Sequence, residues 1–223
     1  MTSVAGTVPA DPPLNCNLCP RLVSLRNDLN TAYPDWFNAP VPSFASADPP
    51  ELLIVGLAPG LKGANRTGRP FTGDYAGDLL YETMLEFGFA SGQYNADPGD
   101  GLTLHGAMIT NAVRCLPPEN KPTGPEIRTC RPFLLSTLEQ NASVRTVLAL
   151  GRIAHDTFLS TLSLRRASYP FAHGASFDLG VRNLQLFDSY HCSRYNTNTG
   201  RLTPEMFKSV FADIRRYLDS QKL

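Results

Sequence analysis

Residues 51–77 read ELLIVGLAPGLKGANRTGRPFTGDYAG, and this stretch decides the fold class. Its continuous apolar run, Leu52–Leu57, is typical of a strand that is buried on both faces. A Gly-rich loop follows from Ala58 to Gly73, and Tyr75–Phe87 has the amphipathic spacing of a helix that ends at Gly88. A buried strand that runs through such a loop into a helix is typical of an α/β protein with a parallel sheet.

The rest of the chain repeats this alternation of strand and helix. Further strands are predicted at Gly106–Asn111, Val144–Leu150 and Asn183–Ser189. Helices are predicted at Leu18–Leu29, at Pro125–Leu138, from Gly151 through Leu159, and over 203–218 with Thr203 as N-cap. We therefore expect an α/β fold, a three-layer α/β/α sandwich around a central, mostly parallel four-stranded sheet. The Pro- and Ala-rich residues 1–13 are predicted to be a disordered tail, and residues 14–223 a single domain.

Composition narrows the class of protein. With 42% hydrophobic and 18% charged residues, the 223-residue chain reads as a soluble globular protein that can bury a sizeable core. No apolar run approaches the length of a membrane span, and the first residues lack the pattern of a secretory signal, so we expect a cytoplasmic protein with no membrane partner. Twenty basic residues balance twenty acidic ones, so binding to nucleic acid would depend on a local patch of positive charge. We expect a monomer, because no apolar seam is left over once the core helices are assigned.

Five cysteines in a chain of this kind point away from disulfide bonds and toward metal binding or catalysis. Cys16 and Cys19 form a C-x2-C pair, and Cys115 and Cys130 lie far from it with fourteen residues between them. Four thiolates brought together by the fold would suit either a [4Fe–4S] cluster or zinc, and spacing alone does not choose between them. The alternative is a set of free buried cysteines. Cys192 is expected to be no ligand.

In a parallel α/β sheet, ligands bind at the carboxyl ends of the strands, and the unusual residues of this chain cluster there. Loop 56–77 has six glycines, which let the backbone approach a ligand, together with positive charge. A phosphate-binding loop is the plainer alternative, but Phe71 could stack on a base and Asp74 could orient water. His191 follows the last predicted strand, although a lone histidine is more often structural. Asn111 ends its strand with an amide that suits the imide edge of a base such as uracil, unless it only forms a turn.

Taken together, these segments resemble the type b, or family 5, uracil-DNA glycosylases. The matching pieces are GLAPG (56–60), NRTGRPFTGD (65–74), TNAVRC (110–115) and HCSRYNTNTGRLTPEM (191–206). The four cysteines at 16, 19, 115 and 130 match the cluster ligands of that family, which implies a structural [4Fe–4S] cluster rather than zinc. Most relatives read His-Pro-Ser where this chain has Cys192, and Ala76 replaces a frequent Ser.

The resemblance implies a monofunctional glycosylase of base-excision repair that flips uracil out of DNA and hydrolyses its glycosidic bond, leaving an abasic site. Its first motif lacks an acidic side chain, which implies reliance on leaving-group stabilisation and activity on other deaminated bases such as hypoxanthine. The expected catalytic residues are Asp74, Asn111 and His191. The expected substrate-binding residues are Gly56, Ala58, Gly60, Phe71 and Asn111, and the expected DNA-binding residues are Lys62, Arg66, Arg69, Ser193, Arg194 and Tyr195.

Three alternatives from other classes are weighed against this reading. A non-catalytic iron–sulfur protein that binds damaged DNA would leave the glycosidic bond intact. A small electron-transfer protein would not need the loops 56–77 and 190–203. A nucleotide hydrolase would need more acidic metal ligands near the Gly-rich loop than Asp74 and Asp78. The damage-binding protein ranks second.

Overall fold

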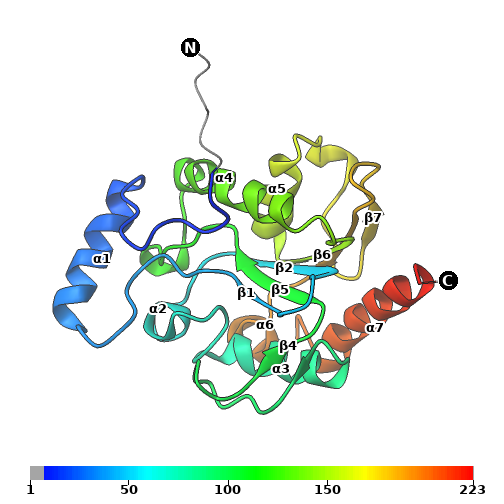
Figure 1. Cartoon of the computed structure of the whole chain (residues 1–223), viewed down its shortest axis with the longest axis horizontal. Helices are drawn as coiled ribbons and strands as arrows, with labels where there is room; N and C mark the ends of the chain where they lie inside the picture. Colours follow the sequence, from blue (N-terminus) through cyan, green and yellow to red (C-terminus); the bar gives the residue numbers. More distant parts are fainter. Residues whose placement is uncertain (1–7, 223) are drawn as a thin grey trace.

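The computed structural model describes residues 8–222, and a six-stranded sheet lies at its centre (Figure 1). The strands are arranged in the order β1-β5-β2-β6-β8-β7, and the four central ones run parallel. Two further short strands pair with each other away from this sheet. The strands are β1 (Phe44–Ala45), β2 (Leu52–Gly56), β3 (Ala90–Ser91), β4 (Thr103–Leu104), β5 (Ala107–Asn111), β6 (Thr146–Leu150), β7 (Ser176–Asp178) and β8 (Gln185–Ser189).

The four predicted strands are the four parallel strands, whereas the two edge strands were not predicted. β1 and β7 pair antiparallel with their neighbours and are only 2 and 3 residues long. Strands of two or three residues are too short to show an alternation of apolar and polar residues. Their pairing depends on contacts with the neighbouring strand, which a local sequence pattern does not reveal. The sheet is therefore six-stranded in the described residues rather than four-stranded, and it remains mostly parallel.

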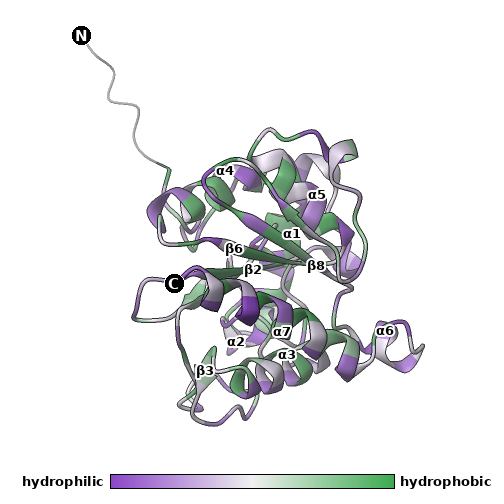
Figure 2. Cartoon of the chain, turned by 90° about the vertical axis from the view of Figure 1, so that its right-hand side faces the viewer, coloured by the Kyte–Doolittle hydropathy of each residue, from purple (hydrophilic) through white to green (hydrophobic). Residues whose placement is uncertain are grey.

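Helices cover both faces of the sheet, which confirms the three-layer α/β/α arrangement. Figures 1 and 2 show α4 and α5 on one side of the strands and α3 and α7 on the other. The helices are α1 (Pro20–Ala32), α2 (Ala64–Thr67), α3 (Tyr75–Glu86), α4 (Gly124–Gln140), α5 (Arg152–Thr161), α6 (Arg194–Asn198) and α7 (Pro204–Ser220), with single 3-10 turns η1 (Pro118–Asn120) and η2 (Arg166–Ser168).

The core has one layer on each face of the sheet, and alternate residues of a strand supply the two layers. Leu52 and Ile54 belong to the cluster beneath α3 and α7, and Leu53 and Val55 belong to the cluster beneath α4 and α5. All five residues of β2 are buried, as a continuous apolar run predicts. In Figure 2 the green, apolar positions line the strands and the inner sides of the helices.

The helices begin where the sequence supplies caps. Thr123 and Glu126 form a reciprocal capping box at the start of α4. Thr203 accepts a hydrogen bond from the Met206 amide at the start of α7, with Pro204 in the first turn as predicted. The part of the chain that the structure describes contains no helix long and apolar enough to cross a membrane.

The predicted disordered tail is wrong for residues 8–13, while residues 1–7 lie outside the described residues. Asp11 accepts hydrogen bonds from Ser43 and pairs with the fully buried Arg114 at 2.9 Å. The carbonyl of Ala10 accepts from Thr137 at 3.0 Å. A buried guanidinium is costly unless it has such partners, and these contacts hold the proline-rich segment against the domain.

Candidate active site

A cavity of about 590 Å³ opens at the carboxyl ends of β2 and β5, beside the loop that follows β8. It brings together most of the predicted site residues from three segments that lie far apart in the sequence. The lining residues are Leu57, Ala58, Pro59, Gly60, Lys62, Ala64, Phe71, Gly73, Asp74, Tyr75, Ala76, Asn111, Asn120, His191, Ser193 and Arg194.

Asp74 enters the cavity from the N-cap of α3, where its chain is extended. Its carboxylate lies against two glycines: a Cβ added to Gly60 would be 2.8 Å from Asp74 Oδ2, and one added to Gly63 would collide with the same atom. Oδ1 is shielded from solvent and has no hydrogen-bond partner among the described residues. Burial raises the pKa of Asp74, an effect that the nearby backbone amides of Gly77 and Ala76 oppose. The carboxylate is therefore held in place by packing, with an oxygen free to accept from a ligand or water.

Asn111 and Phe71 meet beneath the cavity over Gly56. A Cβ on Gly56 would collide with Asn111 Oδ1 and lie 2.7 Å from the Phe71 ring, so only glycine permits this approach. Asn111 is 3% exposed, and its Oδ1 has no partner among the described residues. Gly56 itself does not line the cavity, so its role is to make room rather than to touch a ligand.

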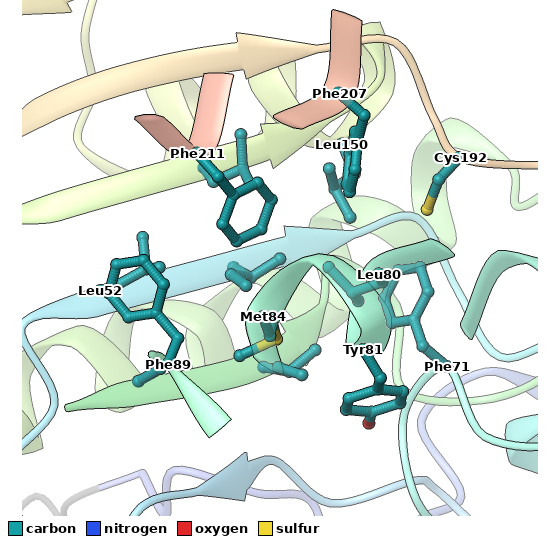
Figure 3. Close-up of a cluster of buried hydrophobic side chains, with 14 of the residues drawn as sticks. Leu52, Phe71, Leu80, Tyr81, Met84, Phe89, Leu150, Cys192, Phe207 and Phe211 are labelled. Atoms are coloured by element: carbon teal, nitrogen blue, oxygen red, sulfur yellow. The ribbon is translucent and has the colours of Figure 1, made fainter. Parts of the chain in front are cut away.

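Phe71 is held in a backbone conformation that costs energy. Its φ of 54° is in the left-handed region, which a bulky side chain rarely adopts. Tyr94 donates a hydrogen bond to its carbonyl at 3.2 Å, and that carbonyl presses on Gly77, where any side chain would collide. Figure 3 shows Phe71 at one end of the large buried cluster, near Cys192.

His191 follows the end of β8 and lies next to Phe71, with ring centroids 5.8 Å apart and an angle of 28° between the planes. Burial lowers the pKa of His191 to about 4. The imidazole is therefore neutral at neutral pH, and it can donate a hydrogen bond without carrying a charge. On its backbone side, Asn196 donates to the His191 carbonyl at 2.8 Å, which ties this position to α6.

The rim of the cavity carries the polar and basic side chains. Lys62 and Arg194 are exposed, and the guanidinium carbon of Arg194 lies 5.3 Å from the centre of the Tyr75 ring. Ser193 caps α6 by accepting from the Asn196 amide. Tyr195 does not line the cavity but is 73% exposed on α6, which projects from the body of the protein in Figure 2.

Arg69 is not available to DNA, so the prediction that it binds DNA is wrong. Its side chain is 6% exposed and makes a bidentate pair with Asp100 at 2.8 and 2.7 Å. The guanidinium also lies over the rings of Tyr81 and Tyr94, and it holds the pKa of Asp100 below the usual range. The sequence signal was misleading because the partner is 31 residues away. Arg66, by contrast, is exposed near the cavity but does not line it.

Asn120 lines the cavity and was missed by sequence reasoning. It ends η1, where Glu119 and Asn120 both have left-handed backbones with φ of 54° and 56°. Asparagine tolerates this conformation better than most residues, which is the one local signal that could have drawn attention to it.

The predicted cysteine ligands come together at the other side of the sheet's carboxyl end. Cys16, Cys19, Cys115 and Cys130 line one small hollow together with apolar residues of α1 and α4. Burial, and then repulsion by neighbouring thiolates, raises the pKa of Cys19 to about 11 and that of Cys115 to about 12. The four side chains are a donor set made only of sulfur, and they would ionise beside a cofactor that supplies positive charge. No three Cys, His, Asp or Glu side chains of residues 8–222 form a group that could hold a metal ion.

Cys192 lies apart from this hollow, inside the core beneath the cavity. Its thiol donates to the Ala76 carbonyl at 3.3 Å. The contact joins the His191 loop to the first turn of α3, next to Asp74.

The arrangement can bind a planar polar ring and act on a bond beside it. Phe71 supplies an apolar face, Asn111 supplies an amide, His191 is a neutral donor and Asp74 is a carboxylate. A neutral donor and a carboxylate on the same cavity suit stabilisation of a leaving group and of a developing positive charge.

Comparison with known proteins agrees with this picture. The family model of the uracil DNA glycosylase superfamily matches residues 42–215. The chain is 46% identical over 208 residues to the type-5 uracil-DNA glycosylase of Thermus thermophilus, covering 90% of this chain and 93% of that protein. It is 39% identical to the type-5 uracil-DNA glycosylase of Mycobacterium bovis over 90% of this chain and 77% of that protein. It is 37% identical to that of Pyrobaculum aerophilum over 88% of this chain and 86% of that protein.

Proposed function

The chain belongs to the uracil-DNA glycosylase superfamily and, within it, to the type-5 group, and on that premise we propose that it excises uracil and other deaminated bases from DNA. The observation that carries the proposal is that Asp74, Asn111 and His191, from three distant segments, line one cavity of about 590 Å³. The reaction is hydrolysis of the bond between the base nitrogen and sugar C1′, which leaves an abasic site.

A base within the duplex cannot reach this cavity, so the nucleotide must be flipped out, which costs a few kcal/mol. Tyr195, exposed on α6, would fill the gap that the flipped nucleotide leaves, and Arg194, next to it in sequence, would hold the strand. Lys62 at the rim, with Arg66 near it, is suited to binding flanking phosphates.

The flipped base would stack on Phe71 with its imide edge toward Asn111. The unpartnered Asn111 Oδ1 can accept from uracil N3–H while the amide nitrogen donates to O4. Hypoxanthine presents the same pair of groups, N1–H and O6. This shared edge supports activity on more than one deaminated base.

Bond cleavage sends the bonding electron pair onto the base and leaves positive charge on the sugar. The neutral His191 would donate a hydrogen bond to uracil O2, where negative charge develops. Asp74 would face the positive sugar and orient the water that adds to C1′, accepting that water's proton or passing it to solvent. Leaving-group stabilisation therefore carries most of the catalysis in this proposal.

We propose that Cys16, Cys19, Cys115 and Cys130 hold a structural [4Fe–4S] cluster. The support is a donor set made entirely of thiols around an apolar hollow. These four residues would hold the cluster, and its iron would supply the positive charge that thiolates in an apolar hollow require. The cluster would fasten α1 to α4 and to the end of β5. We propose further that the described residues 8–222 form one domain, and that the protein acts as a monomer in the cytoplasm.

The test is base release from a labelled duplex that carries one uracil, with enzyme in excess, followed by alkali to cleave abasic sites. We expect strand cleavage that depends on alkali, first with uracil and then with hypoxanthine. Binding to the damaged duplex without base release, by protein that contains iron, would contradict the proposal and favour a damage-binding protein. Uracil release without hypoxanthine release would restrict the substrate range.

A further inference from the structure

Two buried asparagines outside the cavity join α1 to the loop that surrounds Asp74. Asn38 and Asn65 are 2% and 3% exposed, and neither lines the cavity. The Asn65 side chain donates to Asn38 Oδ1 at 2.9 Å, and the Asn38 backbone amide donates to the Asn65 carbonyl at 3.0 Å. The two residues are 27 positions apart, so this pair is a tertiary contact and not a local turn.

On one side, Asn38 closes the end of α1. Its Nδ2 donates to the carbonyls of Leu29 at 3.2 Å and Tyr33 at 2.8 Å. Each carbonyl also accepts a backbone amide, Leu29 from Tyr33 at 2.7 Å and Tyr33 from Trp36 at 3.1 Å, so the Asn38 side chain adds a second donor to both at the end of the helix. At the opposite end of α1, the N-cap residue is Cys19, one of the proposed cluster ligands.

On the other side, Asn65 lies in α2, next in sequence to Ala64, which lines the cavity. Its backbone amide donates to the Gly60 carbonyl at 3.1 Å, which closes the turn from Gly60 to Asn65. Gly60 and Gly63 in this turn are the residues against which the Asp74 carboxylate packs. A shift of α2 would therefore move the surface that positions Asp74.

The residue type at position 38 is explained by these demands. Asn38 has a φ of 42°, in the left-handed region that asparagine tolerates. Its amide donates twice and accepts once, and no other small side chain can do all three in that conformation.

We propose that the Asn38–Asn65 pair is a positioning unit for base excision, through which the placement of α1 fixes the Gly60–Gly63 turn and hence Asp74. The proposal rests on the proposed function for its effect on rate. It does not make either asparagine a catalytic residue, because neither reaches the cavity.

The test compares Asn38→Gly, Asn65→Ala and the control Asn141→Ala. Glycine at 38 keeps the left-handed backbone free of strain, so it removes the side-chain hydrogen bonds alone. Asn141 also donates to a carbonyl near a helix C-terminus, that of Thr137 at 2.7 Å, but on α4. Three quantities are measured for each variant: the single-turnover rate of uracil release, the Kd for a duplex with a stable abasic-site analogue, and the iron content per protein.

For Asn38→Gly and Asn65→Ala we expect the rate to fall about tenfold or more, since displacement of a reacting group by a fraction of an ångström is costly. The Kd and the iron content should stay close to wild type, and Asn141→Ala should keep the wild-type rate. Wild-type rates in both variants would overturn the proposal. A slower rate that is explained by weaker DNA binding or by loss of iron would overturn it as well. If Asn38→Gly does not fold, Asn65→Ala decides, because it removes a single side-chain hydrogen bond.

Amide hydrogen exchange separates this proposal from the proposed function. In both variants we expect faster exchange in the peptide that spans 60–68, and no change there in Asn141→Ala. If the wild-type protein releases no base, the proposed function fails while exchange still tests the coupling. If exchange in the peptide 60–68 is unchanged in both variants, the proposed coupling between α1 and the Gly60–Gly63 turn is wrong, even if the enzyme is active.

Discussion

The cavity and the cysteine hollow lie at the same end of the sheet, yet the surroundings of their polar groups differ. In the cavity, Asp74 Oδ1 and Asn111 Oδ1 are buried without partners among residues 8–222, and Phe71 is held in a left-handed conformation. In the hollow, the thiols are surrounded by apolar side chains, and the amide of Arg114 donates to Cys130 at 3.4 Å.

If the proposed function is right, this contrast distinguishes residues that serve a ligand from residues that serve the fold. Unpartnered polar atoms and backbone strain lower stability, and those in a cavity lining are available to a ligand. A cluster bound by thiolates would instead add its binding free energy to the folded state. Changes in the cavity should therefore reduce activity and spare stability, and changes in the hollow should do the reverse.

The largest effect is expected in the hollow. Cys130→Ser should abolish iron binding and lower the free energy of unfolding by more than about 3 kcal/mol, because a structural metal centre is lost. Iron content and urea unfolding measure this. The matched control is Cys192→Ser, a buried cysteine outside the hollow, which should keep its iron. Full stability in iron-free Cys130→Ser would break the contrast.

In the cavity, His191→Ala and Asp74→Asn should each slow single-turnover excision by more than about tenfold. Asp74→Asn should also raise the free energy of unfolding at neutral pH, because burial disfavours the charged carboxylate. Rate and unfolding are measured on the same preparations. Near wild-type rates in both variants would show that these roles are wrongly assigned.

The pH profile sharpens the assignment of Asp74. Its raised pKa means that the carboxylate takes up a proton at higher pH than an ordinary aspartate, and excision should slow as the pH falls through that range. The pKa of His191 is lowered to about 4, so its imidazole is neutral above that pH. The free energy of unfolding changes in the opposite direction and rises as the pH falls. Burial of the Asp74 carboxylate costs nothing below the pKa of Asp74 in the unfolded chain, and it costs the full amount above the pKa of Asp74 in the folded protein.

The difference in unfolding free energy between Asp74→Asn and wild type should therefore grow as the pH rises through this interval. Unfolding curves of both proteins across acid pH measure it. A difference that is constant with pH would mean that Asp74 does not titrate as proposed.

The smallest effect is expected at the rim. Tyr195 is 73% exposed, so Tyr195→Ala should change the free energy of unfolding by less than about 0.5 kcal/mol. It should still weaken binding to a damaged duplex more than to single-stranded DNA, since only the duplex requires a gap to be filled. Tyr33→Ala, at an exposed tyrosine beyond α1, is the control. An equal loss of affinity for the duplex and for single-stranded DNA would argue against insertion of Tyr195 into the duplex.

Much of the fold and part of the site were predictable from the sequence. The four parallel strands are continuous apolar runs, because both of their faces are buried, and this signal is local. The strand ends then indicate where Asn111 and His191 lie, because parallel strands bring their carboxyl ends to one edge. The C-x2-C pair and its two distant partners likewise indicate the hollow.

What the tertiary structure alone decided are the roles that depend on distant partners. Arg69 looks like a free cation in its glycine-rich loop, and only the fold shows that Asp100 occupies it. Asn120 reaches the cavity through a left-handed turn, and Asn38 meets Asn65 across 27 residues. The sequence determines propensity, apolar periodicity and spacing, which act over a few residues. Pairing of buried polar groups is decided by which segments the packed core brings into contact, and no local pattern records that.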